Sequence, residues 1–424
     1  MLFKHIENRQ VRYLVSFVLF FCLFISFFSL FSHAWPVVVL SSLIILLVYK
    51  FDSFILKDSH DLGTYWKISL LLFFVVCFSI LMTNPTLFFI AKFEPYWILI
   101  LWPIFLMALA HSDLSFDQFI KTFLLAGLVL LVWLILVLIE EPKRGVGLLD
   151  DPIQRGNIAM MVGLLSLVMV FYFKSIFWKL LSFIVFISGV GLSILSASRG
   201  GWLAFFISAL TLFFVLWRFD KKQIKLFFIV LVFFLGLIFL NIQDTPIISR
   251  INQALSDLER YFLQDYARTS VGYRLEMWLV SIHAFTDKAI LGWGFDSFSS
   301  VYNQFVSQGL VEPPPGNRNW GQPHNDYLRF LVELGLVGFV TLMAFLLYPV
   351  KVYISSLQYV EQLEKNKSRE LVYLVLLGLV ITESMMEFML TDRNFTTQPM
   401  MYFYVIFSAS ILFFIGQALK SRAD

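Results

Sequence analysis

The sequence predicts an all-α fold, a polytopic transmembrane helical bundle of about 12 spans with a helical loop between spans 9 and 10. Hydrophobic residues make up 59% of the 424 residues and charged residues only 14%, whereas a soluble globular chain carries about 25% charged residues. The chain also contains 49 Phe, more than a water-facing fold can bury. Its apolar surface must therefore continue into lipid.

The apolar residues occur in stretches that are long enough to cross a bilayer, which requires about 20 mostly apolar residues in a helix. The first stretch, Val11 to Phe31, is too long for the core of a signal peptide and lacks a small-residue cleavage site, so we expect a retained first span. The twelve expected spans are 12–31, 35–50, 66–82, 95–111, 119–139, 157–173, 176–197, 201–217, 225–241, 326–349, 370–390 and 399–418.

One connection is much longer than the others, at residues 242–325. It is polar and arginine-rich, and it contains the turn sequence Pro313-Pro314-Pro315-Gly316. Residues 247–266 and 272–286 have the apolar spacing of helices. We expect this loop to cap one face of the bundle, so that residues 1–424 form a single membrane-embedded domain.

The basic residues predict the orientation of the bundle, because short cytoplasmic loops are enriched in Lys and Arg. Placing the N-terminus in the cytoplasm assigns 19 basic residues to the inside and 13 to the outside. Twelve spans then return the C-terminus to the cytoplasm and leave the long loop on the outside. We therefore expect a multi-pass membrane protein, and the net charge of +3 gives no reason to expect a nucleic-acid partner.

The two predicted sides differ in the kind of basic residue that they carry. The inside has 14 Lys and 5 Arg, and the outside has 3 Lys and 10 Arg. Lysine is a hydrated point charge, whereas the planar guanidinium of arginine fits phosphate oxygens. An arginine-rich outer face suits a lipid substrate that carries a diphosphate. Alternatively, these arginines pair with nearby acids, among them Asp150, Asp151, Asp257 and Glu259.

His324 is the strongest candidate for proton transfer, because its side chain titrates near neutral pH and it lies at the mouth of the tenth span. Asn325 and Asp326 beside it are placed to orient the ring or to cap the following helix. The alternative is an interfacial histidine near lipid headgroups. The other histidines are scattered without ligand spacing, so we expect neither a metal site nor another cofactor.

Three arginines lie where spans are expected to meet the outer surface. Arg199 in SASRGGWL is expected at the boundary of spans seven and eight, where an arginine is costly and a functional role is the default. Arg274 in GYRLEMW lies on an expected helix of the long loop. Arg155 opens the sixth span, and its alternative interpretation is an arginine that reaches toward the headgroups.

Three acids lie in the outer half of the eleventh span: Glu383, Glu387 and Asp392. Glu383 and Glu387 are four residues apart and share a helix face. Two carboxylates within an apolar span need a partner, and we expect Arg393 or an arginine of the long loop to supply it. A structural ion pair and a direct role in the site both remain open.

Four of these segments together resemble the O-antigen ligase and polymerase superfamily of bacterial glycan transferases. They occur in the order SASRGGWL (196–203), GYRLEMW (272–278), LGWGFDSF (291–298) and PHNDYLRFLVELGLVG (323–338). The last contains the ligase pattern His-Asn, nine residues, Gly, two residues, Gly. The resemblance covers the core at residues 190–390, about half of the chain, and the first five spans match only in character.

The resemblance implies a role for each matched position. Arg199 and Arg274 would bind the diphosphate of an undecaprenyl-linked glycan, and His324 would act as general base or position the acceptor. Arg155, Asn325 and Glu387 would contribute to substrate binding. The reaction would use neither a metal nor a nucleotide sugar, and the acceptor would be the glycolipid lipid A–core in lipopolysaccharide synthesis. The site and the long loop would lie on the periplasmic face of the bacterial inner membrane.

Other acceptors and one other class of protein remain as alternatives. A polymerase would use a second lipid-linked glycan as acceptor. A protein O-oligosaccharyltransferase is suggested by Glu387-Phe388-Met389-Leu390, which matches the Glu-Tyr-Pro-Leu element of those enzymes at two of four positions. A transporter of lipid-linked sugars predicts polar residues through the middle of several spans or paired internal repeats. The charges gather at the outer end instead.

Overall fold

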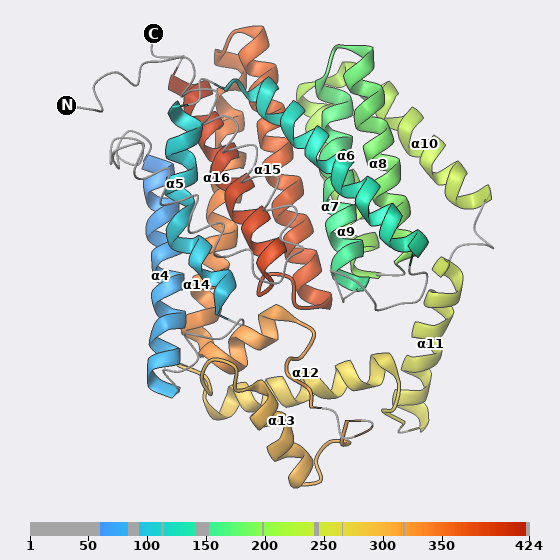
Figure 1. The fold of residues 1–424 in the computed structure, drawn as a ribbon, viewed down its shortest axis with the longest axis vertical. Coiled ribbons are helices and arrows are strands. Elements are labelled where there is room, and N and C mark those ends of the chain that lie inside the picture. The colour runs from blue at the N-terminus through green and yellow to red at the C-terminus, as the bar shows by residue number, and fades with distance from the viewer. Residues whose placement is uncertain are drawn as a thin grey trace.

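The computed structural model describes residues 60–83, 93–111, 114–140, 152–196, 199–240, 246–264, 266–314, 316 and 319–420. Every regular element in these residues is a helix (Figure 1), as the sequence predicts. The expected spans at 12–31 and 35–50 lie outside the described residues.

Ten of the expected spans lie on helices, with ends that differ by a few residues. Before the long loop these are α4 (His60–Thr83), α5 (Ile98–His111), α6 (Phe116–Glu140), α7 (Pro152–Tyr172), α8 (Ile176–Leu195), α9 (Arg199–Phe219) and α10 (Ile224–Leu240). After it come α14 (Asp326–Ser356), α15 (Lys365–Thr391) and α16 (Gln398–Lys420). Three short 3-10 turns complete this part: η2 (Glu94–Trp97), η3 (Lys221–Gln223) and η5 (Leu357–Gln362). Seven helices of the described residues are long and apolar enough to cross a membrane.

The helices pack side by side around one large apolar core to which most of them contribute. α7, α16 and α15 are central, since 94%, 83% and 78% of their most apolar stretches are buried, against 33% for α4 at the edge. Small residues let the central helices approach closely. A Cβ on Gly189 of α8 would collide with the carbonyl oxygen of Ala159 on α7.

The long loop contains α11 (Pro246–Gln264), α12 (Ser270–Asp287) and α13 (Phe298–Ser307). In Figure 1, α12 runs across one end of the bundle with α13 beside it, and α11 stands at the edge. We call these three helices the cap and that end the cap end. α11 and α12 match the predicted helices, whereas the sequence analysis did not predict α13. The cap has its own small core, formed mainly by Met277, Val280, Phe298 and Tyr302. Val332 of α14 completes it and joins the cap to the bundle.

Gly335 kinks α14 near its start, where the sequence pattern predicts an uninterrupted span. Its φ of 65° breaks the helix, and a Cβ there would collide with the carbonyl oxygen of Ile290. The LGWGFDSF segment and the two residues before it satisfy the backbone groups that the kink frees. Trp293 and Gly294 donate to the carbonyls of residues 332 and 333, and the amides of residues 336 and 337 donate to residues 289 and 290. Backbone hydrogen bonds between residues 289–294 and residues 332–337 therefore hold the cap against α14.

The basic residues separate between the ends of the bundle. The end opposite the cap carries Lys121, Lys174, Lys179, Lys221, Lys222, Lys225, Lys351, Lys365, Lys367, Lys420, Arg218 and Arg369. The cap and its end of the bundle carry Lys288 and Arg155, Arg250, Arg260, Arg268, Arg274, Arg329 and Arg393. Lysine thus predominates at the end opposite the cap, and arginine predominates at the cap end.

Candidate active site

His324 lies in the segment that leads from the cap into α14. Its φ of 51° is unusual for a residue other than glycine, so the surrounding contacts must hold it there. On one side, Trp278 of α12 donates its indole N–H to the carbonyl of Pro323, at 3.1 Å. On the other side, the Asn325 side chain caps α14 by accepting from the Leu328 amide at 3.1 Å. The histidine is therefore fixed between a cap helix and a bundle helix.

The partner of His324 is Asp392, the residue after α15. The Nδ1 atom of His324 lies 2.8 Å from Oδ1 of Asp392, and the aspartate side chain is fully buried. Burial alone would raise the pKa of the Asp392 carboxyl, but the hydrogen bond and charge of His324 lower it below its usual value. The amide of Arg393 also donates to Oδ1, at 2.8 Å. Asp392 is thus ionised at neutral pH and fixes the proton of His324 on Nδ1.

Arg274 lies close enough to act on the same carboxylate. Its positive charge contributes to the lowered pKa of Asp392. Arg274 lies in the second turn of α12, whose first turn is capped by the Thr269 hydroxyl accepting from the Gly272 amide at 3.0 Å. His324 and Arg274, 50 residues apart in the sequence, therefore share Asp392 as a neighbour.

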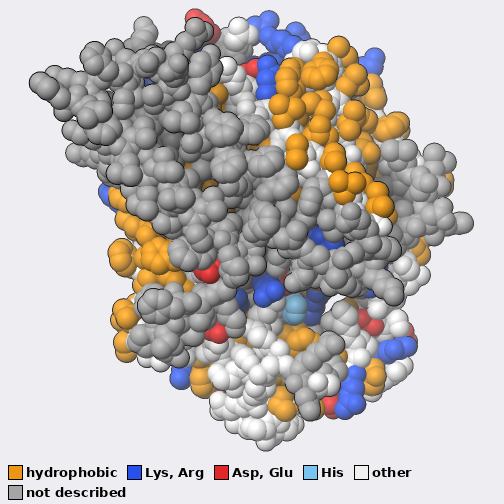
Figure 2. All heavy atoms as spheres, viewed as in Figure 1, with side chains coloured by type: hydrophobic (Ala, Val, Ile, Leu, Met, Phe, Trp, Pro, Cys, Tyr) orange, Lys and Arg blue, Asp and Glu red, His pale blue; other side chains and the backbone are white. Residues whose placement is uncertain are grey.

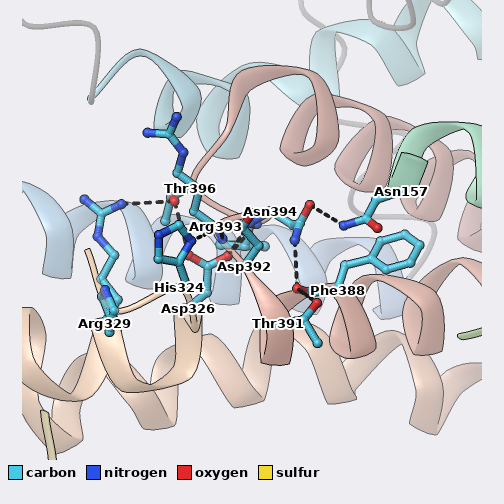
Figure 3. A network of polar contacts seen from close by, with 12 residues as sticks. Asn157, His324, Asp326, Arg329, Phe388, Thr391, Asp392, Arg393, Asn394 and Thr396 are labelled. Carbon is cyan, nitrogen blue, oxygen red and sulfur yellow. Dashed lines mark hydrogen bonds and ion pairs between the residues drawn. The ribbon is translucent and has the colours of Figure 1, made fainter. Parts of the chain in front are cut away.

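A hydrogen-bond network holds the 392–397 segment, which connects α15 to α16, in place (Figure 3). Asp326 at the start of α14 accepts from the amides of Asn394 and Phe395, each at 2.7 Å. The Asn394 side chain connects the segment to α15 and α7. It donates to the carbonyl of Phe388 at 2.7 Å and accepts from Asn157 of α7 at 3.1 Å. The network joins α7, α14 and α15 and so fixes the position of Asp392.

Arg329 reinforces this segment from within the bundle. Its guanidinium donates to the Thr396 hydroxyl and to Glu333, both at 3.1 Å, and the Arg329–Glu333 pair is buried. The Thr396 side chain in turn contacts Asp326 at 3.2 Å. A buried ion pair with all its hydrogen bonds made favours one arrangement of the loop. Arg329 is therefore part of the scaffold beneath His324.

Arg199 begins α9 beside the same segment. A Cβ on the next residue, Gly200, would collide with the hydroxyl of Thr391, the last residue of α15 and the neighbour of Asp392. Glycine therefore allows the start of α9 to touch the end of α15. The free amides of a helix N-terminus attract anions. Figure 2 shows a histidine side chain with Lys or Arg side chains on both sides of it, where the bundle meets the cap.

Residues 184–343 match the family model described as O-antigen ligase. Over these residues the chain is similar to the O-antigen ligase family. It is also 29% identical over 209 residues, 48% of its length, to an uncharacterized protein of Haemophilus influenzae. The chain spans about half (52%) of the length of that relative. The family match and the seven long apolar helices of the described residues indicate a multi-pass membrane protein.

The ligase-family match divides the site into two parts. Arg199, Arg274 and His324 lie within the matched residues 184–343. Asp392 lies beyond them, directly after α15, and Asn157 lies before them on α7. The family segment thus provides the histidine and two arginines, and flanking helices provide the groups that hold the histidine.

The structure places the other predicted binding residues around this centre. Asn325 uses its side-chain oxygen to cap α14. Arg155 is buried in α7, two residues before Asn157, and its Nε has no hydrogen-bond partner within the described residues. It therefore does not reach out to the headgroups. Glu387 lies on α15, one turn before Thr391, with Oε2 buried and likewise unbonded.

The expected arginine partners of Glu383 and Glu387 are not found. Glu383 accepts a hydrogen bond from the Thr211 hydroxyl at 2.7 Å instead. Neither glutamate forms an ion pair with an arginine whose side chain the structure describes. The Arg393 side chain also points away from His324 (Figure 3). The prediction was wrong because Arg393 lies beyond the helix end and is exposed.

Asp392 was grouped with these two glutamates in the sequence, and its pairing with His324 was not predicted. The two residues are 68 positions apart on different helices. The only local signal is the TDRN sequence, a polar break directly after an apolar span.

Proposed function

We propose that this protein transfers a glycan from undecaprenyl diphosphate to lipid A–core, with its site on the periplasmic face of the bacterial inner membrane. The observation that carries the proposal is the hydrogen bond of His324 to the buried carboxylate of Asp392, with Arg274 beside it. A paired histidine provides a base, and arginine provides a diphosphate ligand. The match of residues 184–343 to the O-antigen ligase family model supports both roles.

The reaction uses the free nitrogen of His324. Because Asp392 holds the proton on Nδ1, Nε2 carries a lone pair and accepts the proton of the acceptor hydroxyl. The hydroxyl oxygen forms a bond to the anomeric carbon of the sugar, and the bond from that carbon to the diphosphate oxygen breaks. The electron pair leaves with undecaprenyl diphosphate, and His324 later releases its proton to water. Such a base contributes about 10²–10⁴-fold to the rate.

The arginines act on the leaving group. Negative charge builds on the diphosphate oxygen as the bond to the sugar breaks, and fixed positive groups stabilise that charge best where water is scarce. We assign this role to Arg274 and Arg199, together with the amides at the start of α9. Arg155 is a further diphosphate ligand, since its buried Nε has no acceptor among the described residues. Asn325 and Glu387 then line the substrate site, and no metal takes part.

The orientation follows from the arrangement of charge. Lysine predominates at the end opposite the cap, which the positive-inside rule assigns to the cytoplasm. The cap and His324 then face the periplasm, and both termini face the cytoplasm.

A panel of acceptors tests the proposal. Purified wild-type protein is incubated with an undecaprenyl-diphosphate glycan and, in separate reactions, with lipid A–core, a second lipid-linked glycan or a pilin. We expect glycan on lipid A–core. Elongated lipid-linked glycan would instead identify a polymerase, and a modified pilin would identify a protein oligosaccharyltransferase. Movement of the donor across a vesicle membrane without any product would identify a transporter.

A further inference from the structure

A hollow of about 670 Å³ lies at the end of the bundle opposite the cap. Three segments line it: the α7–α8 connection, the α9–α10 connection with η3, and the first turn of α15. α15 has 27 residues and runs from this hollow to Asp392, a length of about 40 Å at 1.5 Å per residue. The hollow is therefore separate from the site at His324.

Positive charge dominates the lining of the hollow. Six of its residues are cationic: Lys174, Arg218, Lys221, Lys222, Lys365 and Arg369. The only acidic residue in the lining is Asp220, and it is already bound by the Tyr373 hydroxyl at 3.0 Å and by Arg369 at 3.6 Å.

The four lysines of the lining have no acidic partner within the described residues. Arg218 pairs with Glu361 at 3.2 Å, and both side chains are exposed. Arg369 donates to the carbonyl of Phe171 at 2.8 Å. The four lysines are exposed and form no ion pair within the described part of the chain. Like charges held around one hollow repel each other unless an anion lies between them.

The surroundings of the hollow are apolar on the side of the bundle. Phe219 and Tyr373 form part of its wall. Below it, Trp217 and Phe214 of α9 are 55% and 64% exposed, as expected for side chains that face lipid. Lys221 also lies over the Trp217 ring, at 6.0 Å from its centroid. An aromatic residue at the end of an apolar helix marks the membrane interface, so the hollow opens where headgroups lie.

We propose that this hollow binds the phosphate-bearing headgroup of an anionic glycerophospholipid, whose acyl chains lie against the exposed apolar face of α9. The lysines supply the charge, and the lipid-facing aromatic residues supply the contact with the chains. Lysines that only set the orientation of the bundle need no shared hollow, because they act through loop position alone. Basic pockets between membrane helices are known to hold such headgroups.

The test measures lipid binding by purified full-length protein. Native mass spectrometry and thermal melting are recorded with diphosphatidylglycerol, phosphatidylglycerol and phosphatidylcholine, and with inorganic diphosphate as a soluble anion. Each lysine near an anionic surface contributes about 1 kcal/mol, which is about fivefold in affinity. The double variant Lys221→Gln/Lys222→Gln should therefore bind diphosphatidylglycerol about 25-fold more weakly than the wild type.

The matched control removes the same charge from exposed positions at the same end of the bundle outside the hollow, as Lys351→Gln/Lys420→Gln. It should bind within about twofold of the wild type, because neither lysine lines the hollow and exposed charges act only weakly through salt solution. Equal loss in both double variants would overturn the site and leave only diffuse attraction. Equal affinity for phosphatidylcholine, or binding of inorganic diphosphate as tight as that of the lipid, would overturn the assignment to an anionic lipid.

Discussion

Replacing Asp392 with Asn removes the charge behind His324 and keeps the shape of the side chain. The Arg393 amide holds Oδ1 in place at 2.8 Å, so the amide oxygen of the variant can still accept from Nδ1 of His324. The main loss is then electrostatic. As His324 takes up the acceptor proton, the imidazolium forms next to a carboxylate in the wild type and next to a neutral amide in the variant.

The distance of 2.8 Å between the two side chains places their charge centres about 4 Å apart, where unit charges attract by about 4 kcal/mol at an effective dielectric of about 20. With about half of the proton transferred in the transition state, the loss is about 2 kcal/mol. At 1.4 kcal/mol per tenfold, kcat should fall about 30-fold. KM should change less than about threefold, since Asp392 is fully buried and does not touch the acceptor.

The assay is glycan transfer by purified protein in nanodiscs, with initial rates measured against acceptor concentration and only folded protein counted. Asp287→Asn is the matched control, because Asp287 is an exposed acid at the far end of α12. It should leave kcat unchanged. A kcat for Asp392→Asn within threefold of the wild type, or a loss confined to KM, would refute the role of Asp392 in positioning and charging His324.

Three further predictions concern the cap, the diphosphate ligand and pH. Gly335→Ala should lower the free energy of unfolding by at least about 1 kcal/mol, because alanine is strained at a φ of 65° and its Cβ would collide with the carbonyl oxygen of Ile290. The melting temperature should therefore fall. The control, Gly236→Ala on α10, adds a Cβ that meets no atom within 4 Å and should not lower it. Arg274→Lys should reduce the rate of glycan transfer at least tenfold, because a lysine point charge cannot replace the planar guanidinium. Arg268→Lys is the control and should not reduce it, since Arg268 is an exposed partner of Glu312. Equal transfer rates for the two variants would exclude Arg274 from diphosphate binding. Because folding lowers the pKa of Asp392 below 3.8, its ionised form stabilises the fold above that pH and the effect is lost as pH falls further. The melting temperatures of the wild type and Asp392→Asn should therefore differ between pH 5 and 8 and converge below pH 3.8; a constant difference would contradict the ion pair.

The helices were predictable from the sequence because a membrane span is a local property. Twenty apolar residues form a helix in lipid whatever their neighbours, so α7, α8 and α9 begin and end close to the predicted residues. Local capping was predictable for the same reason: Asn325 precedes its helix and caps it.

The contacts between helices were not predictable from one sequence. Asn157 bonds to Asn394 across 237 positions, and no pattern in either segment indicates the other. The kink at Gly335 depends on backbone groups of residues 289–294, so the apolar periodicity of α14 predicts a straight helix. Arginine was expected beside Glu383 on grounds of charge, but the Thr211 hydroxyl on α9 provides a hydrogen bond there.

The most direct test of the account is the rate of glycan transfer by His324→Ala, reconstituted with an undecaprenyl-diphosphate glycan and lipid A–core. Removal of His324 leaves the buried carboxylate of Asp392 without its ion-pair partner, so the melting temperature should fall, and rates are compared only for folded, membrane-inserted protein. We predict that transfer falls at least about 100-fold, the smallest contribution expected of a general base. Transfer at the wild-type rate by the folded variant would contradict the mechanism.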